Sequence, residues 1–269
     1  GLGRCAALAT NMACELLTVG QMAQADALTI EAGTPGFTLM QAAGRAVAQA
    51  IVQRWSPRAT VVLCGPGNNG GDGLVAAAEL LQQGWPVRVA MLAEPERLAG
   101  DARLAWAHWQ ARCAACAPGQ TLSAVLDEAG LDGQALVVDA LFGAGLTRPL
   151  EGMAARVLAK AQRKGLPIVA VDVPSGVWGD SGASAGAVHC DVTVTFFRLK
   201  PAHLLMPGRQ LCGERVLADI GVPDTVLTRL QVRAWQNEPA LWQTVYPRAD
   251  VAGHKYHRGH ALVWGGPLM

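Results

Sequence analysis

The sequence predicts an α/β protein with a Rossmann-like, doubly wound, mostly parallel sheet and helices on both faces, a three-layer α/β/α arrangement. The first observation is that short runs of β-branched residues alternate with longer segments rich in Ala and Leu. The second is that these runs lack polar alternation, as expected for strands buried on both faces. The third is the composition, 51% hydrophobic and 16% charged, which supports a large core and excludes an intrinsically disordered protein.

In chain order, two helices are expected first, at 18–30 and 39–52, separated by the turn-forming sequence GTPG. Strands are then expected at 60–64, 87–92, 135–139, 168–172 and 192–196, where Val, Ile and Thr dominate. Between them, helical composition and spacing predict helices near 73–83, 96–113, 122–130 and 153–164. Sheets of this kind place ligands beyond the carboxyl ends of their strands.

Charge and cysteine content limit the classes of partner. The 22 Lys and Arg residues nearly balance the 21 Asp and Glu residues, so nothing favours binding to nucleic acid or to an acidic membrane surface. Apolar runs are too short for a membrane span, and the one at 74–81 is interrupted by Glu79. The seven cysteines are odd in number and irregularly spaced, which is typical of reduced thiols in a cytoplasmic protein.

A glycine-rich segment, GPGNNGGDG at 65–73, follows the first core strand. Its glycines allow close approach of a ligand, and the following helix offers free N–H groups to an anion such as phosphate. The segment also matches the dinucleotide pattern G-x-G-x-x-G, with Glu94 at a suitable distance to hold a ribose. However, Asn68, Asn69 and Asp72 crowd the turn with side-chain oxygens. A plain strand-to-helix turn with Asn in left-handed conformations is the alternative.

Two further strands end in a carboxylate that precedes a glycine-containing loop. These are Asp139 in VVDALFGAGLTRP and Asp172 in VAVDVPSG. A single such Asp could merely cap the next helix. Two of them, beside the glycine-rich segment, are expected to converge with it at one edge of the sheet, where ligands bind.

These segments are similar to those of the NAD(P)H-hydrate epimerase family, also called the YjeF N-terminal domain. The motifs GPGNNGGDG, VVDALFGAGLTRPLEG, VAVDVPSGVWGDSG and FFRLKPAHLLMPGR occur in the family's order and spacing, and LLTVGQMAQAD and GTPGFTLMQAAG fit as well. The resemblance covers about residues 16–222. It implies interconversion of the R and S epimers of NADHX and NADPHX, the forms of the nicotinamide cofactors hydrated at ring carbon 6.

The resemblance also implies a set of site residues. It implies a bound potassium ion (K+), one per subunit, at Asn69, Asp139 and Ser175, and this agrees with the preference of hard cations for oxygen donors. It implies a homodimer too. The substrate-binding residues that it implies are Asn68, Asn69, Gly70, Gly71, Asp72, Gly143, Ala144, Gly145, Leu146, Thr147, Arg148, Pro149 and Asp172.

Epimerisation requires the hydroxyl to leave and water to return on the opposite face, so an acid/base group must lie near that oxygen. Asp139 is the first candidate for proton transfer, directly or through a bound water. Arg148, and less strongly Lys200, are candidate phosphate partners. Gln41 stands where family members commonly carry an acidic residue, which puts in doubt an electrostatic role for that helix.

Two alternatives remain open. One is an NAD-dependent oxidoreductase that uses G-x-G-x-x-G and Glu94. The other is a non-catalytic scaffold of the same fold that binds a nucleotide or a protein. The pair Cys113 and Cys116 has redox spacing, but the end of a packed or surface helix is the favoured interpretation.

The domain organisation predicted from these patterns is an epimerase domain at 12–227, a linker at 228–246 and a truncated second domain at 247–269. The last segment resembles the opening of the ADP- or ATP-dependent NAD(P)H-hydrate dehydratase domain, of which only one strand, 260–264, would be present. Its cluster of His254, His257 and His260 is interpreted as a solvated turn rather than a metal site. Residues 1–11 are interpreted as an extension ahead of a natural start at Met12.

Overall fold

A computed structural model of the chain describes residues 14–127, 131, 135–246, 262–263 and 265. Two compact units divide the chain, residues 1–236 and residues 237–269. Within the described part of the second unit there is one short helix, α7 (Pro239–Trp242), whose Trp242 indole donates a hydrogen bond to Asn237. The sequence-predicted extension at 1–11, the histidine cluster and most of the dehydratase-like segment lie outside the described residues.

The first unit is built on a seven-stranded sheet with the order β4-β3-β2-β5-β6-β7-β8, in which every neighbouring pair is parallel. Its strands are β2 (Thr60–Cys64), β3 (Val87–Met91), β4 (Ala124–Val125), β5 (Leu136–Ala140), β6 (Ile168–Val171), β7 (Val192–Phe196) and β8 (Glu214–Ala218). A separate two-stranded antiparallel sheet joins β1 (Glu15–Leu16) to β9 (Ala234–Trp235).

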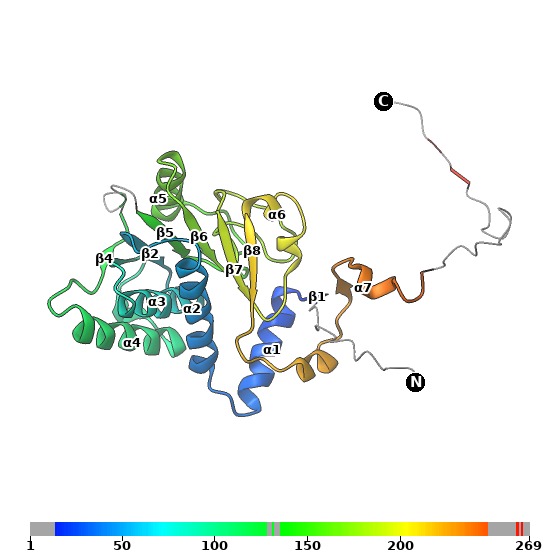
Figure 1. Ribbon diagram of the computed structural model, residues 1–269, viewed down its shortest axis with the longest axis horizontal. Helices are drawn as coiled ribbons and strands as arrows, with labels where there is room; N and C mark the ends of the chain where they lie inside the picture. Colours follow the sequence, from blue (N-terminus) through cyan, green and yellow to red (C-terminus); the bar gives the residue numbers. More distant parts are fainter. Residues whose placement is uncertain (1–13, 128–130, 132–134, 247–261, 264, 266–269) are drawn as a thin grey trace, which may run out of the picture. The chain divides into compact units, whose positions relative to one another are not determined.

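Helices cover both faces of the sheet, which confirms the predicted fold class (Figure 1). Successive residues of β2 point to opposite sides of the sheet: Val62 and Cys64 belong to the core on one face, and Val61 and Leu63 belong to the core on the other face. The helices are α1 (Val19–Glu31), α2 (Gly36–Val52), α3 (Asn68–Gln82), α4 (Gly100–Cys116), α5 (Gly152–Arg163) and α6 (Gly208–Leu211), with 3-10 turns η1 (Pro95–Arg97), η2 (Pro201–His203) and η3 (Asp224–Arg229). Among the described residues, no helix is long and apolar enough to cross a membrane.

The five predicted core strands and most helices are present within a few residues of the expected bounds. The helix predicted at 122–130 is wrong over its described residues, because β4 occupies 124–125 and pairs with the edge of β3. Leu122 packs on the core of one sheet face and Leu126 on the core of the other. In an amphipathic helix, two residues four positions apart would lie on the same face. The edge strand β8 is absent from the sequence-based prediction, because it begins with the charged residues Glu214 and Arg215 and lacks a run of β-branched residues.

The strand order reverses between β2 and β5: β3 and β4 are added on one side of β2, and β5 to β8 are added on the other. The helices that follow β2 and β5, α3 and α5, lie on opposite faces of the sheet. In open α/β sheets this switch point leaves a crevice beyond the strand ends. The segments that follow β2, β5 and β6 therefore meet there, and the site is built from them.

Candidate active site

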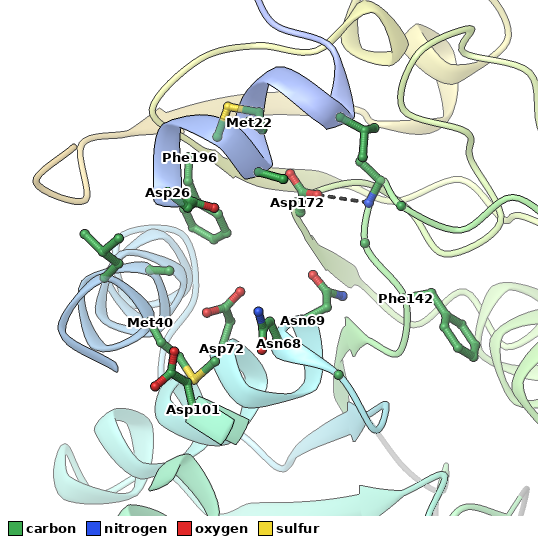
Figure 2. Close-up of a pocket in the computed structure, with 18 of the residues that line it drawn as sticks. Met22, Asp26, Met40, Asn68, Asn69, Asp72, Asp101, Phe142, Asp172 and Phe196 are labelled. Carbon is green, nitrogen blue, oxygen red and sulfur yellow. Dashed lines mark hydrogen bonds between the residues drawn. The ribbon is translucent and has the colours of Figure 1, made fainter. Parts of the chain in front are cut away.

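A cavity of about 590 Å³ lies at the switch point, and the sequence-predicted segments contribute much of its lining. Asn68, Asn69 and Asp72 reach it from the start of α3, and Asp172 reaches it from the end of β6. Residues 143–146 of the loop after β5 complete this side. Figure 2 shows Asp72 and Asp172 pointing toward the same open space. The structure thus brings the three predicted segments together.

The glycine-rich segment differs from the predicted loop, because α3 begins at Asn68 instead of near Gly73. Several of its glycines are required by close packing against the rest of the protein, whereas Gly67, which lines the cavity, has no neighbour near its Cβ position. A Cβ on Gly70 would lie 1.9 Å from the Gly65 carbonyl oxygen, and one on Gly73 would lie 2.5 Å from the Ala140 side chain. The asparagines have helical backbone, so the alternative of left-handed Asn residues in this turn is wrong.

Asp172 is held by an extensive network. It has a left-handed backbone with φ of 70°, and its Oδ2 accepts a hydrogen bond from Ala144 N at 3.0 Å. Its Oδ1 lies 2.7 Å from Lys200 Nζ and accepts a hydrogen bond from Thr195 Oγ1 at 3.0 Å. Burial opposes ionisation, but Lys200 and the hydrogen bonds outweigh it and lower the pKa of Asp172 to about 2. Asp172 is therefore ionised at neutral pH.

His203 fixes the backbone of Asp172. Lys200 N donates to His203 Nδ1 at 2.9 Å, so the ring proton is on Nε2, which donates to the Asp172 carbonyl oxygen at 2.9 Å. Burial, reinforced by the charge of Lys200, lowers the pKa of His203 to about 4. The segment FFRLKPAH thus supplies both the counter-charge and the backbone support of Asp172. Lys200, the weaker candidate for a phosphate partner, is paired with this carboxylate and also lines the cavity.

Asp139 has no exposed surface and lies behind the cavity lining. Its Oδ1 accepts from Ser175 Oγ at 2.6 Å and from Leu141 N at 3.3 Å, and its Oδ2 accepts from Ser175 N at 2.8 Å. Burial raises the pKa of Asp139, although these hydrogen bonds oppose the rise. In this arrangement Asp139 faces Ser175 rather than the cavity, so an acid/base role would have to act through another group.

The predicted potassium ligands can be tested against their surroundings. Within the described residues, Asp139 forms no ion pair with a basic side chain, although it is a buried carboxylate. Asn69, the third predicted ligand, would have to contribute its Oδ1, because its buried and unpaired Nδ2 is a hydrogen-bond donor and does not bind a cation. A buried carboxylate whose partners are all neutral, with the Ser175 hydroxyl beside it, offers the oxygen donors that a hard monovalent cation prefers.

Other predicted residues lie outside the main cavity. Gly70 and Gly71 are buried in α3. Thr147 lines a second, 370 Å³ cavity, whereas Arg148 and Pro149 line neither cavity, and the Arg148 guanidinium lies 5.9 Å from the Phe142 ring centre. Glu94 is exposed and absent from the main lining, so the ribose contact required by the oxidoreductase alternative is not formed there. Gln41 is partly buried in α2 and is also absent from that lining.

The sequence analysis missed the contribution of α1. Met22, Asp26 and Ile30 line the cavity from this helix. They follow one another at intervals of four residues, so a carboxylate within an otherwise apolar helical stripe was the available signal. Met40 and Phe196 add apolar walls.

Comparisons with known proteins agree with this architecture. The model of the protein family described as YjeF-related protein N-terminus matches residues 36–202 of this chain. The bifunctional NAD(P)H-hydrate repair enzyme Nnr of Thermofilum pendens is 39% identical over 243 residues, which cover 86% of this chain and 45% of that protein. The NAD(P)H-hydrate epimerase of Rhodobacter capsulatus is 41% identical over 201 residues, which cover 70% of this chain and 91% of that protein.

The chain spans just under half the length of the bifunctional relatives that it matches. A solved structure, that of yeast ynu0 (YNL200c), superimposes with a TM-score of 0.64 at 22% identity, over 83% of this chain and 96% of the yeast chain. This likeness concerns the fold. With the family match and the 41% identical relative, it leads to one conclusion: the chain belongs to the YjeF N-terminal family.

Proposed function

We propose that this chain interconverts the R and S epimers of NADHX and NADPHX. The observation that carries the proposal is the convergence of α3, the loop after β5 and Asp172 on one 590 Å³ cavity. Relatives of about 40% identity bear the name NAD(P)H-hydrate epimerase, and the chain covers most of their length. The cavity combines apolar walls with a few convergent polar groups, as expected for a small-molecule site.

In the proposed reaction the hydrated ring lies in the cavity and loses its hydroxyl, so that positive charge develops on the ring. Asp172, ionised and held by Lys200, presents a fixed negative charge to this space. Asn69 and residues 143–146 hold the ring and its ribose in place. Return of water to the opposite face of the ring completes the epimerisation.

The cation-binding residues of the proposal are Asn69, Asp139 and Ser175. K+ bound there would supply positive charge that offsets the buried carboxylate of Asp139 and stabilises the junction between β5 and the loop after β6. Asp139 and Ser175 themselves fix this junction, since Ser175 Oγ also accepts a hydrogen bond from Phe142 N at 2.9 Å. On this proposal Asp139 is a cation ligand and positioning residue.

The proposal is tested by incubating R-NADHX with the protein and separating the epimers by chiral chromatography, in potassium-containing and potassium-free buffer. We expect approach to the equilibrium mixture faster than without protein, and a higher rate with potassium. Hydride transfer with intact NAD would instead favour the oxidoreductase alternative. A folded protein that binds the hydrate or another partner without epimerising it would favour the scaffold.

Further features of the whole protein are also proposals. The dehydratase-like segment would belong to a second activity that uses ADP or ATP, by analogy with the bifunctional relatives. The six cysteines of the described residues are free thiols, which is consistent with a reducing, cytoplasmic location. A homodimer would be checked by light scattering at several concentrations.

A further inference from the structure

Asp26 on α1 is a cavity carboxylate to which the proposed reaction has so far given no role. Figure 2 shows it on α1 in the wall of the cavity that Asp72 and Asp172 also line. Across the described part of the chain, the Asp26 side chain forms no hydrogen bond or ion pair. It is partly buried and lies among the apolar residues Met22, Ile30, Phe196 and Ile220. A carboxyl group in such surroundings is available to a ligand.

Asp26 and Asp172 occupy contrasting environments in one cavity. Asp172 is paired with Lys200 and accepts hydrogen bonds from Thr195 and Ala144. Burial raises the pKa of Asp26 to about 6, with Lys200 opposing the rise and Asp172 adding to it. Two carboxyl groups whose environments separate their pKa values commonly divide the acid and electrostatic roles of a reaction.

We propose that Asp26 is the proton donor to the departing hydroxyl of the hydrated ring. This inference rests on the proposed epimerase function. The carboxyl proton passes to the hydroxyl oxygen, the bond from ring carbon 6 to that oxygen breaks with its electron pair going to oxygen, and water leaves. The lone pair of the ring nitrogen forms a C=N bond, which makes the ring cationic. Water then adds to the opposite face, and the proton that it releases returns to the Asp26 carboxylate through water in the cavity.

The surroundings favour Asp26 over the other carboxyl groups. Asp139 has no exposed surface, and its carboxylate oxygens accept hydrogen bonds from Ser175 and Leu141 and do not line the cavity. Asp72 faces the cavity, but burial and the charges of Asp172 and Asp26 raise its pKa well above the usual range, so it releases a proton less readily. General acids work best when their pKa lies near the working pH. The charged groups that share the cavity with Asp26 are Asp72 from α3, Asp101 from α4, Asp172 after β6 and Lys200 after β7.

The test compares Asp26→Asn, Asp26→Ala and the control Glu31→Gln, which removes an exposed carboxylate from the same helix outside the cavity. Epimerisation of R-NADHX is followed between pH 5 and 8.5 with the rate without protein subtracted at each pH. For Asp26→Asn we expect kcat to fall by about 100-fold or more and KM to change by less than about threefold. The wild-type kcat should decline as pH rises above about 6, and Asp26→Asn should lack this decline.

Added formate distinguishes a proton donor from a residue that only supports the structure. Formate should restore part of the kcat of Asp26→Ala at pH 5 to 6 and leave Glu31→Gln unchanged. Circular dichroism melting confirms that each variant is folded. If wild type and Asp26→Asn share one kcat and one pH profile, or if formate fails to rescue Asp26→Ala, the assignment is overturned while the epimerase proposal stands. If the wild-type protein does not epimerise R-NADHX in potassium buffer, the proposed function itself is overturned.

Discussion

The ion pair between Lys200 and Asp172 brings together a lysine and an aspartate that are 28 positions apart in the sequence, and both side chains are largely buried. Removing one partner of such a pair leaves the other charge without compensation, which costs more than the pair itself contributes. Asp172 also has a left-handed backbone, which the hydrogen bond from His203 supports. Stability and site geometry therefore depend on the same few contacts.

Lys200→Met should lower the free energy of unfolding by about 3 kcal/mol at pH 7, because Asp172 stays ionised without its counter-charge. Asp172→Asn/Lys200→Met should lose less than the sum of the single variants, as a double-mutant cycle in urea would show. Because the pKa of Asp172 is lowered from 3.8 to about 2, its contribution is present above pH 4 and lost as pH falls toward 2. If Lys200→Met lost the same free energy of unfolding at pH 7 and at pH 2.5, this explanation would be contradicted.

The pKa of Asp26 gives a pH dependence of the opposite sign. Because it is raised from 3.8 to about 6, the ionised carboxylate destabilises the folded protein, and this penalty appears as pH rises from 4 through 6. Asp26→Asn should therefore raise the free energy of unfolding by about 1–2 kcal/mol at pH 7.5 and by much less at pH 4. Urea denaturation of both proteins at the two pH values measures this difference. A gain in the free energy of unfolding that appeared only at pH 4 would refute the prediction.

Gly143 lies between two side chains of the site. A Cβ at this position would lie 3.1 Å from Asn69 Oδ1 and 3.1 Å from Asp172 Oδ2. Gly143→Ala should therefore displace these groups by a few tenths of an ångström and lower kcat/KM about tenfold or more, with little change in thermal stability. Gly20→Ala is the control, because Gly20 does not line the main cavity and the nearest neighbour of its Cβ would be 4.0 Å away. Equal activities of the two variants would show that this spacing is unimportant.

At the scale of elements, α3 shows how packing overrides helix propensity. Glycine costs about 1 kcal/mol relative to alanine inside a helix, so the segment at 68–73 is predicted as a loop from its composition. In the structure it forms the first turns of α3, because only glycine lets the helix approach β2 and the neighbouring backbone. The sequence therefore located the motif but could not distinguish glycines that pack on protein from glycines that contact a ligand.

Gly70→Ala should destabilise the protein by more than about 3 kcal/mol, because the new methyl group would meet the Gly65 carbonyl, a backbone atom that cannot move aside. Gly67→Ala is the control, since a Cβ there meets no atom within 4 Å and the backbone is extended. Differential scanning calorimetry of both variants compares them directly. Similar melting temperatures would contradict the packing argument.

The same distinction explains which site residues the sequence could predict. Asp172 and the segments 68–72 and 143–146 follow core strands, so strand periodicity alone places them at the ligand edge. Asp26 lies on a helix outside the βα units, and its approach to the cavity depends on how α1 packs. The pairing of Lys200 with Asp172 could not be predicted from the sequence either, because no local pattern shows whether a lysine pairs with a carboxylate or with a ligand.

At the scale of the molecule, the first compact unit extends to Gln236, nine residues beyond the predicted domain boundary at 227. Leu230 is 2% exposed and belongs to the main core, and Gln21 Nε2 donates to its carbonyl oxygen at 2.9 Å. A chain ending after residue 236 should keep the melting temperature of the 269-residue chain within about 2 °C. A chain ending after residue 227 should lose about 2–4 kcal/mol, because the packing of Leu230 is removed. Equal stability of the two truncated chains would favour the boundary predicted from the sequence.

Arg198 adds side-chain contacts to the pairing of β1 with β9. This buried guanidinium donates to Glu15 and to Asp224, each at 2.8 Å, and Glu15 is the register partner of Trp235. The first and last described strands of this unit are thus held side by side. A bridge of a few residues could join them, so the unit is suited to circular permutation, with new ends opened in a surface loop far from the cavity.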